Sequence, residues 1–213
     1  MPNSIERALE AALTDRFLFG QVLVRKTDAG SFVLSHVEDE NRNGLKTLQN
    51  AEDAAEIAKY DAAGNYRPLK TAPNLQHGWR LELATLEELK GALDYFYPGR
   101  LAVLIAWKTG QLRTTALRET LDRQSGMYRV AAKISDEQID NLVADFCRSD
   151  GGCLRTILWK RDQHGAMAST KLPREKFDVS HDQTGHEERG VPLLCQEACN
   201  LLVAECRKVV KTE

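Results

Sequence analysis

All five cysteines of this chain lie after residue 146, and this distribution constrains the fold more than any other feature of the sequence. A chain of 213 residues can bury a sufficient core without cross-links. Cysteines grouped in one segment of a cytoplasmic protein therefore indicate metal binding or redox chemistry before disulfides. The competing interpretation is that they are small buried apolar side chains. The five are Cys147, Cys153, Cys195, Cys199 and Cys206.

Four of these cysteines form two local pairs. Cys147 and Cys153 are predicted to lie at the end of a helix, with five residues between them that include two glycines able to turn tightly. Cys195 and Cys199 are four residues apart, so on a helix both sulfurs would lie on one face near the positive end of the dipole. Two such pairs can gather four thiolates around zinc or around an iron–sulfur cluster. The wide first gap favours the cluster over the usual zinc loops.

The fifth cysteine is predicted to pack in a core. Val191 and Pro192 are expected to open a terminal helix, because proline is favoured in the first turn. Cys206 would lie on this helix about two turns beyond Cys199. Its apolar neighbour Val203 favours packing over a role as a ligand.

The hydrophobic patterning predicts an α+β fold with two domains. Residues 1–130 are expected to form a mixed domain, and residues 131–213 a smaller, mainly helical domain that carries the cysteines. Two capping boxes mark helix starts, Thr85 with Glu88 and Ser135 with Gln138. The predicted elements are helix 1–13, a hairpin of 17–25 and 31–37, helix 51–60, strand 80–84, helix 85–96, two helices within 101–121, helix 135–146, a strand-like run at 153–159 and a terminal helix from 191.

Composition excludes several classes of protein. The net charge of −2 argues against a dedicated nucleic-acid binder. No segment reaches the roughly 18 apolar residues of a membrane span, and the start of the chain does not read as a signal peptide, so we expect a cytoplasmic protein. The sequence also lacks a glycine-rich phosphate loop, a nucleophile elbow and a metalloprotease motif.

Other candidate residues have a structural and a functional interpretation. Arg67, in the irregular loop 60–79, could stack on a planar ligand such as a tetrapyrrole, but anchoring of the loop is favoured. His77 is interpreted as a loop anchor, and His181 and His186 as residues of a solvated loop rather than metal partners. Arg155 and Lys160, after the first cysteine pair, could offset the charge of a cluster or could equally be solvent-facing residues of a strand. Gly126, Met127 and Tyr128 could line the cluster pocket, but packing at a domain boundary is favoured.

The cysteine-bearing strings resemble a known family. Residues 146–159 (FCRSDGGCLRTILW) and 192–202 (PLLCQEACNLL) are similar to the [4Fe–4S]-binding domain of sirohydrochlorin cobaltochelatase-like proteins. The upstream part is similar to the stabilising domain of that family. This second similarity is carried by residues 19–25 (FGQVLVR), 60–70 (YDAAGNYRPLK), 72–75 (APNL), 78–80 (GWR) and 123–129 (RQSGMYR).

The resemblance implies a [4Fe–4S] cluster on Cys147, Cys153, Cys195 and Cys199. The chelatase domain that precedes these two domains in the long proteins has no counterpart here. We therefore expect a redox or structural accessory to tetrapyrrole or cobalamin-pathway chelation, whose partner is a chelatase or an electron-transfer protein. The alternative is a zinc-stabilised interaction module on the same four cysteines. An independent enzyme has the least support, because no acid–base pair stands out.

Overall fold

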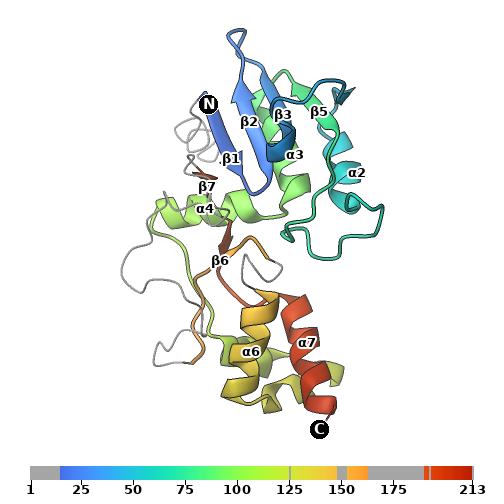
Figure 1. Ribbon diagram of the computed structural model, residues 1–213. Coiled ribbons are helices and arrows are strands. Elements are labelled where there is room, and N and C mark those ends of the chain that lie inside the picture. Colours follow the sequence, from blue (N-terminus) through green and yellow to red (C-terminus); the bar gives the residue numbers. More distant parts are fainter. Residues whose placement is uncertain (1–14, 125, 148–152, 163–189, 192, 213) are drawn as a thin grey trace.

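The computed structural model describes residues 15–124, 126–147, 153–162, 190–191 and 193–212, and they form an α+β protein with a sheet-based part and a helical part (Figure 1). The predicted helix 1–13, His181 and His186 lie outside the described residues. The main sheet has the strand order β4-β5-β3-β2-β1-β7, and a second sheet pairs β6 with β8. The strands are β1 (Arg16–Phe19), β2 (Val22–Lys26), β3 (Phe32–His36), β4 (Lys46–Leu48), β5 (Trp79–Leu83), β6 (Thr156–Ile157), β7 (Gly190–Val191) and β8 (Leu194–Cys195).

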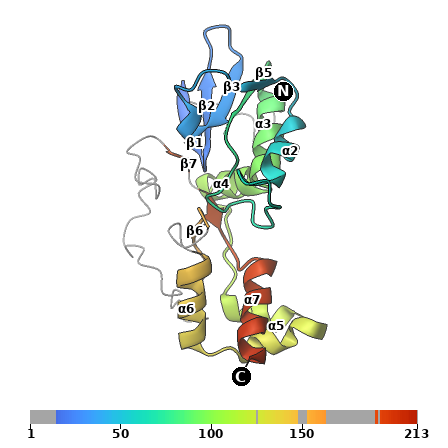
Figure 2. The same ribbon diagram turned by 45° about the vertical axis from the view of Figure 1, so that its right-hand side comes forward.

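The helices divide between two hydrophobic cores. Helices α2 (Asp53–Lys59), α3 (Leu86–Phe96) and α4 (Arg100–Lys108) bury apolar side chains in the same core as the main sheet. Leu117 and Leu121, which precede residue 130, belong to the second core. Figure 2 shows the helical part below the sheet, with β6 between the two parts. The helical part contains α5 (Leu117–Arg123), the 3₁₀ segment η2 (Gly126–Lys133), α6 (Asp136–Phe146) and α7 (Asn200–Lys211).

Both predicted capping boxes are confirmed. The Thr85 hydroxyl accepts a hydrogen bond from the Glu88 backbone N–H at 3.2 Å, and the Glu88 carboxylate accepts one from the Thr85 backbone N–H at 2.9 Å. Ser135 and Gln138 make the same reciprocal pair at the start of α6. These local bonds satisfy backbone donors that a helix start leaves free, so they mark helix starts independently of tertiary structure.

The predicted strand 17–25 is in fact two strands that form a hairpin. β1 and β2 are antiparallel, with Phe19 opposite Val22, so only Gly20 and Gln21 form the turn. Gly20 has φ +62°, which favours glycine at the first position of such a two-residue turn. The Tyr97 hydroxyl accepts a hydrogen bond from the Gln21 backbone N–H at 2.7 Å. The sequence pattern does not reveal this turn, because only one glycine interrupts the apolar run.

The terminal helix begins at Asn200, so the predicted start at Val191 was wrong. Residues 190–191 and 194–195 form strands instead: β7 pairs with β1, and β8 pairs with β6 in parallel. Cys195 therefore lies on a strand and not on the helix face predicted for it. The physical reason is burial on both sides, since Leu193 and Leu194 pack in the first core and Cys195 in the second.

Within the described ranges, no helix combines the length and the apolar character that crossing a lipid bilayer requires.

A partly exposed ion-pair cluster beside the main sheet predicts a pH-dependent stability. The Glu40 carboxylate accepts hydrogen bonds from Arg16 at 2.6 and 3.0 Å and also contacts Arg25. The hydrogen bonds from Arg16 first, and then Arg25, lower the pKa of Glu40 to about 2. Because the folded pKa lies below the unfolded value near 4.5, this stabilisation is present above that pH and is lost as the pH falls towards 2.

We therefore expect Glu40→Gln to lower the free energy of unfolding at pH 7 by about 1 kcal/mol, a value reduced for solvent screening. The difference from wild type should shrink between pH 4.5 and about 2. Urea unfolding across this pH range measures it, with Glu52→Gln, an exposed carboxylate, as the control. A Glu40→Gln penalty that does not change with pH would contradict the assignment.

Candidate metal centre

The four predicted ligand cysteines come from four different local positions. Cys147 is the C-cap residue of α6, and Cys153 opens the extended segment that leads into β6. Cys195 ends β8, and Cys199 is the N-cap residue of α7. Parallel pairing of β6 with β8 brings the Cys153 and Cys195 segments together. The sheet pairing thus unites the two sequence pairs, with Cys153 and Cys195 buried and the other two half-buried.

The thiols of the second pair are held by local hydrogen bonds. The Cys199 sulfur accepts a hydrogen bond from the Leu202 backbone N–H at 3.5 Å. Cys199 thus lies at the N-terminus of a twelve-residue helix, where the helix dipole is positive. The Cys195 thiol donates to the Glu197 carbonyl at 3.0 Å. Residues 196–199 therefore form a short connection between strand and helix, and they do not extend the helix.

The electrostatics show that the four cysteines act on one another. Burial raises the pKa of Cys147, and Cys153, Cys199 and Cys195 raise it further. Burial also raises the pKa of Cys195, against the effect of Arg155. Four thiolates this close would repel one another in a poorly solvated site, so they need a compensating cation. Metal ions meet this need, because they deprotonate the thiols that they bind.

Arg155 supplies positive charge beside the thiols. The Arg155 guanidinium lies 4.0 Å from the Cys195 sulfur. Although burial lowers the pKa of Arg155, Cys195 and the neighbouring thiols raise it above its usual value. Among the described residues, the buried Arg155 Nε is one of few side-chain nitrogens without a hydrogen-bond partner. An anionic group between the cysteines could accept this hydrogen bond.

The sheet-based part of the protein also reaches the site. The Thr71 hydroxyl lies 3.1 Å from the Cys153 sulfur, and the Thr71 carbonyl accepts a hydrogen bond from the Leu154 N–H at 2.7 Å. Arg100, the first residue of α4, donates to the Leu194 carbonyl at 2.6 Å. Burial and Arg155 lower the pKa of Arg100, while the cysteines act in the opposite direction. Thr71 and Arg100 cannot be recognised from the sequence, since neither belongs to a motif.

Cys206 lies in the second core, as the packing interpretation predicted. Its side chain is 1% exposed and belongs to the same cluster as Leu202 and Val203. Burial raises its pKa to about 11, so the thiol remains neutral at physiological pH. A neutral, buried thiol behaves as a small apolar side chain.

The interpretation of Arg67 as a loop anchor is the one that the contacts support. Its guanidinium is 1% exposed and donates to the carbonyls of Ala58, Lys70 and Ala72 and to the Asn74 side chain, at 2.8 to 3.0 Å. Because the guanidinium is buried, neither of its faces is open to a planar ligand. The side chains of Gly126, Met127 and Tyr128 lie outside the described part of the chain.

Comparison with known proteins matches the sheet-based part and the helical part of the chain to two different families. A family described as a 4Fe–4S iron–sulfur cluster binding domain matches residues 109–208, and the DR2241 stabilising domain family matches residues 6–109. All five cysteines fall inside the first match. No curated protein matches the chain. The first of these matches assigns the helical part of the chain to the class of iron–sulfur cluster binding domains.

Together, the two family models match residues 6–208, which is almost the whole chain. A similar solved structure is DR2241 from Deinococcus radiodurans, described as a multi-domain protein with structural similarity to chelatases and two additional novel domains. It shares 29% sequence identity with this chain at a TM-score of 0.77, over 98% of the present chain. The chain spans only 41% of the length of that protein.

Proposed function

We propose that the protein binds a [4Fe–4S] cluster through Cys147, Cys153, Cys195 and Cys199, and that it serves metal chelation in a tetrapyrrole pathway as a redox or structural accessory. The observation that carries the cluster assignment is the grouping of four interacting thiols beside a buried, partly unsatisfied arginine. An iron–sulfur cluster with four thiolate ligands carries negative charge, and a positively charged arginine beside the thiols suits such a group.

The protein's own residues would tune the site. A bound cluster would supply a one-electron redox centre. Positive charge on Arg155 and Arg100 stabilises the reduced, more negative state of a group bound by the thiols. It would therefore raise the reduction potential of that group. Thr71 adds a hydroxyl beside Cys153, where a hydrogen bond to sulfur acts in the same direction. Burial of Cys153 and Cys195 limits the access of water.

The accessory role rests on the relative. DR2241 combines a chelatase-like structure with two additional domains, and almost the whole of the present chain matches part of that protein. We infer that this chain acts beside a chelatase, either by transferring electrons or by stabilising the assembly. The tetrapyrrole class of substrate is part of the same proposal.

The first test is anaerobic purification followed by an absorption spectrum and by determination of iron, sulfide and zinc. We expect about four irons and four sulfides per chain with broad visible absorption. One zinc per chain without visible absorption would overturn the proposal, because zinc has a filled d shell and no such bands. That result would leave a zinc-stabilised interaction module.

A further inference from the structure

A second group of potential metal ligands lies in the sheet-based part, far from any cysteine motif in the sequence. His36 ends β3, Glu38 lies in the 3₁₀ turn η1 (Val37–Asp39), and His77 lies in the loop before β5. β3 and β5 are antiparallel neighbours with Ser35 opposite Arg80. The same register, continued past the strand ends, brings Glu38 level with His77.

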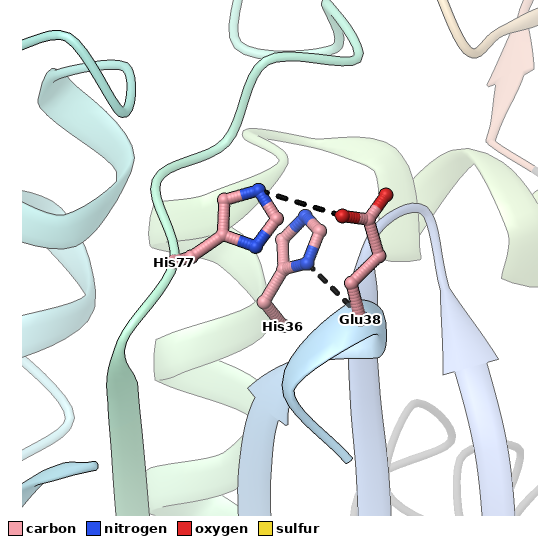
Figure 3. A group of neighbouring side chains, drawn as sticks. All are labelled: His36, Glu38 and His77. Carbon is pink, nitrogen blue, oxygen red and sulfur yellow. Dashed lines mark hydrogen bonds and ion pairs between the residues drawn. The ribbon is translucent and has the colours of Figure 1, made fainter. Parts of the chain in front are cut away.

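The three side chains point towards one another (Figure 3). One ligand atom from each of His36, Glu38 and His77 lies within 4.8 Å of the other two. The His77 Nε2 atom lies 3.7 Å from a Glu38 carboxylate oxygen, and the two imidazole rings have their centroids 3.9 Å apart. Two histidines and one carboxylate form a donor set that suits divalent transition metals and leaves positions for water.

His36 occupies an unusual position for a histidine. It takes an inward-facing place in the alternating pattern of β3, after the apolar Phe32 and Leu34, and its side chain is 0% exposed. Burial first, and then the neighbouring His77, lower its pKa to about 4, so the ring is neutral at pH 7. Neutral imidazole is the form that binds metal ions.

Hydrogen bonding within the protein does not satisfy both nitrogens of this buried ring. Nδ1 faces the Glu38 backbone N–H at 3.2 Å, and Nε2 faces the Gln21 side-chain amide nitrogen at 3.1 Å. A neutral imidazole accepts at only one nitrogen. Turning the Gln21 amide over would only move the conflict, because its oxygen accepts from the Leu75 N–H. One of these two contacts is therefore not a proper hydrogen bond, and a metal ion bound at that nitrogen would replace its present neighbour.

Asp39 is placed to orient His77 from the other side. Its carboxylate lies 4.0 Å from the His77 Nδ1 atom, and it accepts hydrogen bonds from the Gly78 N–H and from Arg42. The Asp39 side chain is 2% exposed, so these contacts hold the loop that carries His77 against η1. A carboxylate behind a histidine is the usual outer partner of a metal-bound imidazole.

We propose that His36, Glu38 and His77 bind one divalent transition metal ion, such as zinc, with water in the remaining positions. The ion joins the end of β3 to the loop before β5. Glu38 is largely exposed, with 66% of its side chain accessible, so its carboxylate can swing onto the ion without disturbing the core. The site is independent of the cysteines and does not rest on the proposed cluster.

The test compares zinc bound per chain in wild type, Glu38→Gln and His77→Gln, with Glu52→Gln as the control. The full chain is purified anaerobically, incubated with excess zinc chloride and dialysed before zinc determination. Zinc held by the cysteines is the same in all four proteins, so the difference reports only the histidine site. Both altered side chains are partly exposed, and we expect the variants to fold.

We expect each of Glu38→Gln and His77→Gln to bind about one zinc fewer than wild type, and Glu52→Gln to match wild type. Zinc should also raise the melting temperature of wild type by more than that of the two variants, because a ligand that binds only the folded state stabilises it. Equal zinc content in wild type, Glu38→Gln and His77→Gln would overturn the proposal. The cluster assignment would be unaffected, since it is read from iron and sulfide.

Discussion

Replacement of Cys195 with serine is expected to abolish cluster binding, with iron and sulfide falling from about four of each per chain to below about one. A serine hydroxyl is far harder to deprotonate than a thiol, so one iron would lose its anionic ligand. Cys195 is 7% exposed and packs in the second core, on the strand paired with β6, so water cannot easily replace it. The measurement is the visible spectrum with iron and sulfide analysis after anaerobic purification.

Cys206→Ser is the matched control for this prediction. Cys206 is the fifth cysteine of the same domain and, like Cys195, is buried in the second core, but it lies outside the two cysteine pairs proposed as ligands. We expect this variant to keep its iron and sulfide and to lose about 1–2 kcal/mol of stability, because a hydroxyl enters an apolar site. Retention of the cluster by Cys195→Ser, or its loss from Cys206→Ser, would contradict the ligand assignment.

The second large effect is expected for Gly20→Ala, which should destabilise the protein by about 2–5 kcal/mol. The positive φ of +62° is strained for any residue with a Cβ. A Cβ at this position would also lie 2.5 Å from the Tyr97 ring and hydroxyl, which are buried. The clash adds an overpacking cost to the backbone strain. Urea-induced unfolding monitored by circular dichroism measures the loss.

Gly30→Ala separates strain from clash. Gly30 has φ +84°, but a Cβ there would meet no atom within 4 Å. This variant should therefore show only the cost of backbone strain, about 1–2 kcal/mol. Equal destabilisation by Gly20→Ala and Gly30→Ala would mean that the Tyr97 ring moves aside at no cost. A larger loss for Gly20→Ala would show that the ring fixes this turn.

Local signals in the sequence were sufficient for the helix starts at Leu86 and Asp136. In both cases the cap and its partner are three residues apart, so the whole interaction lies within one turn. The C-terminal end of α6 at Phe146 also follows from local sequence. The two cysteine pairs were visible for the same reason, since each pair spans fewer than ten residues.

The sequence by itself thus determined the α+β class, the capped helices and the four cysteines proposed as ligands. Only the tertiary structure decided that Cys195 lies on a strand, that Thr71 and Arg100 reach the thiols, and that His36 meets His77. These features depend on strand register and on two cores that share the segment around residue 194. Register is set by contacts between residues far apart in the chain, so no local pattern of residues reports it.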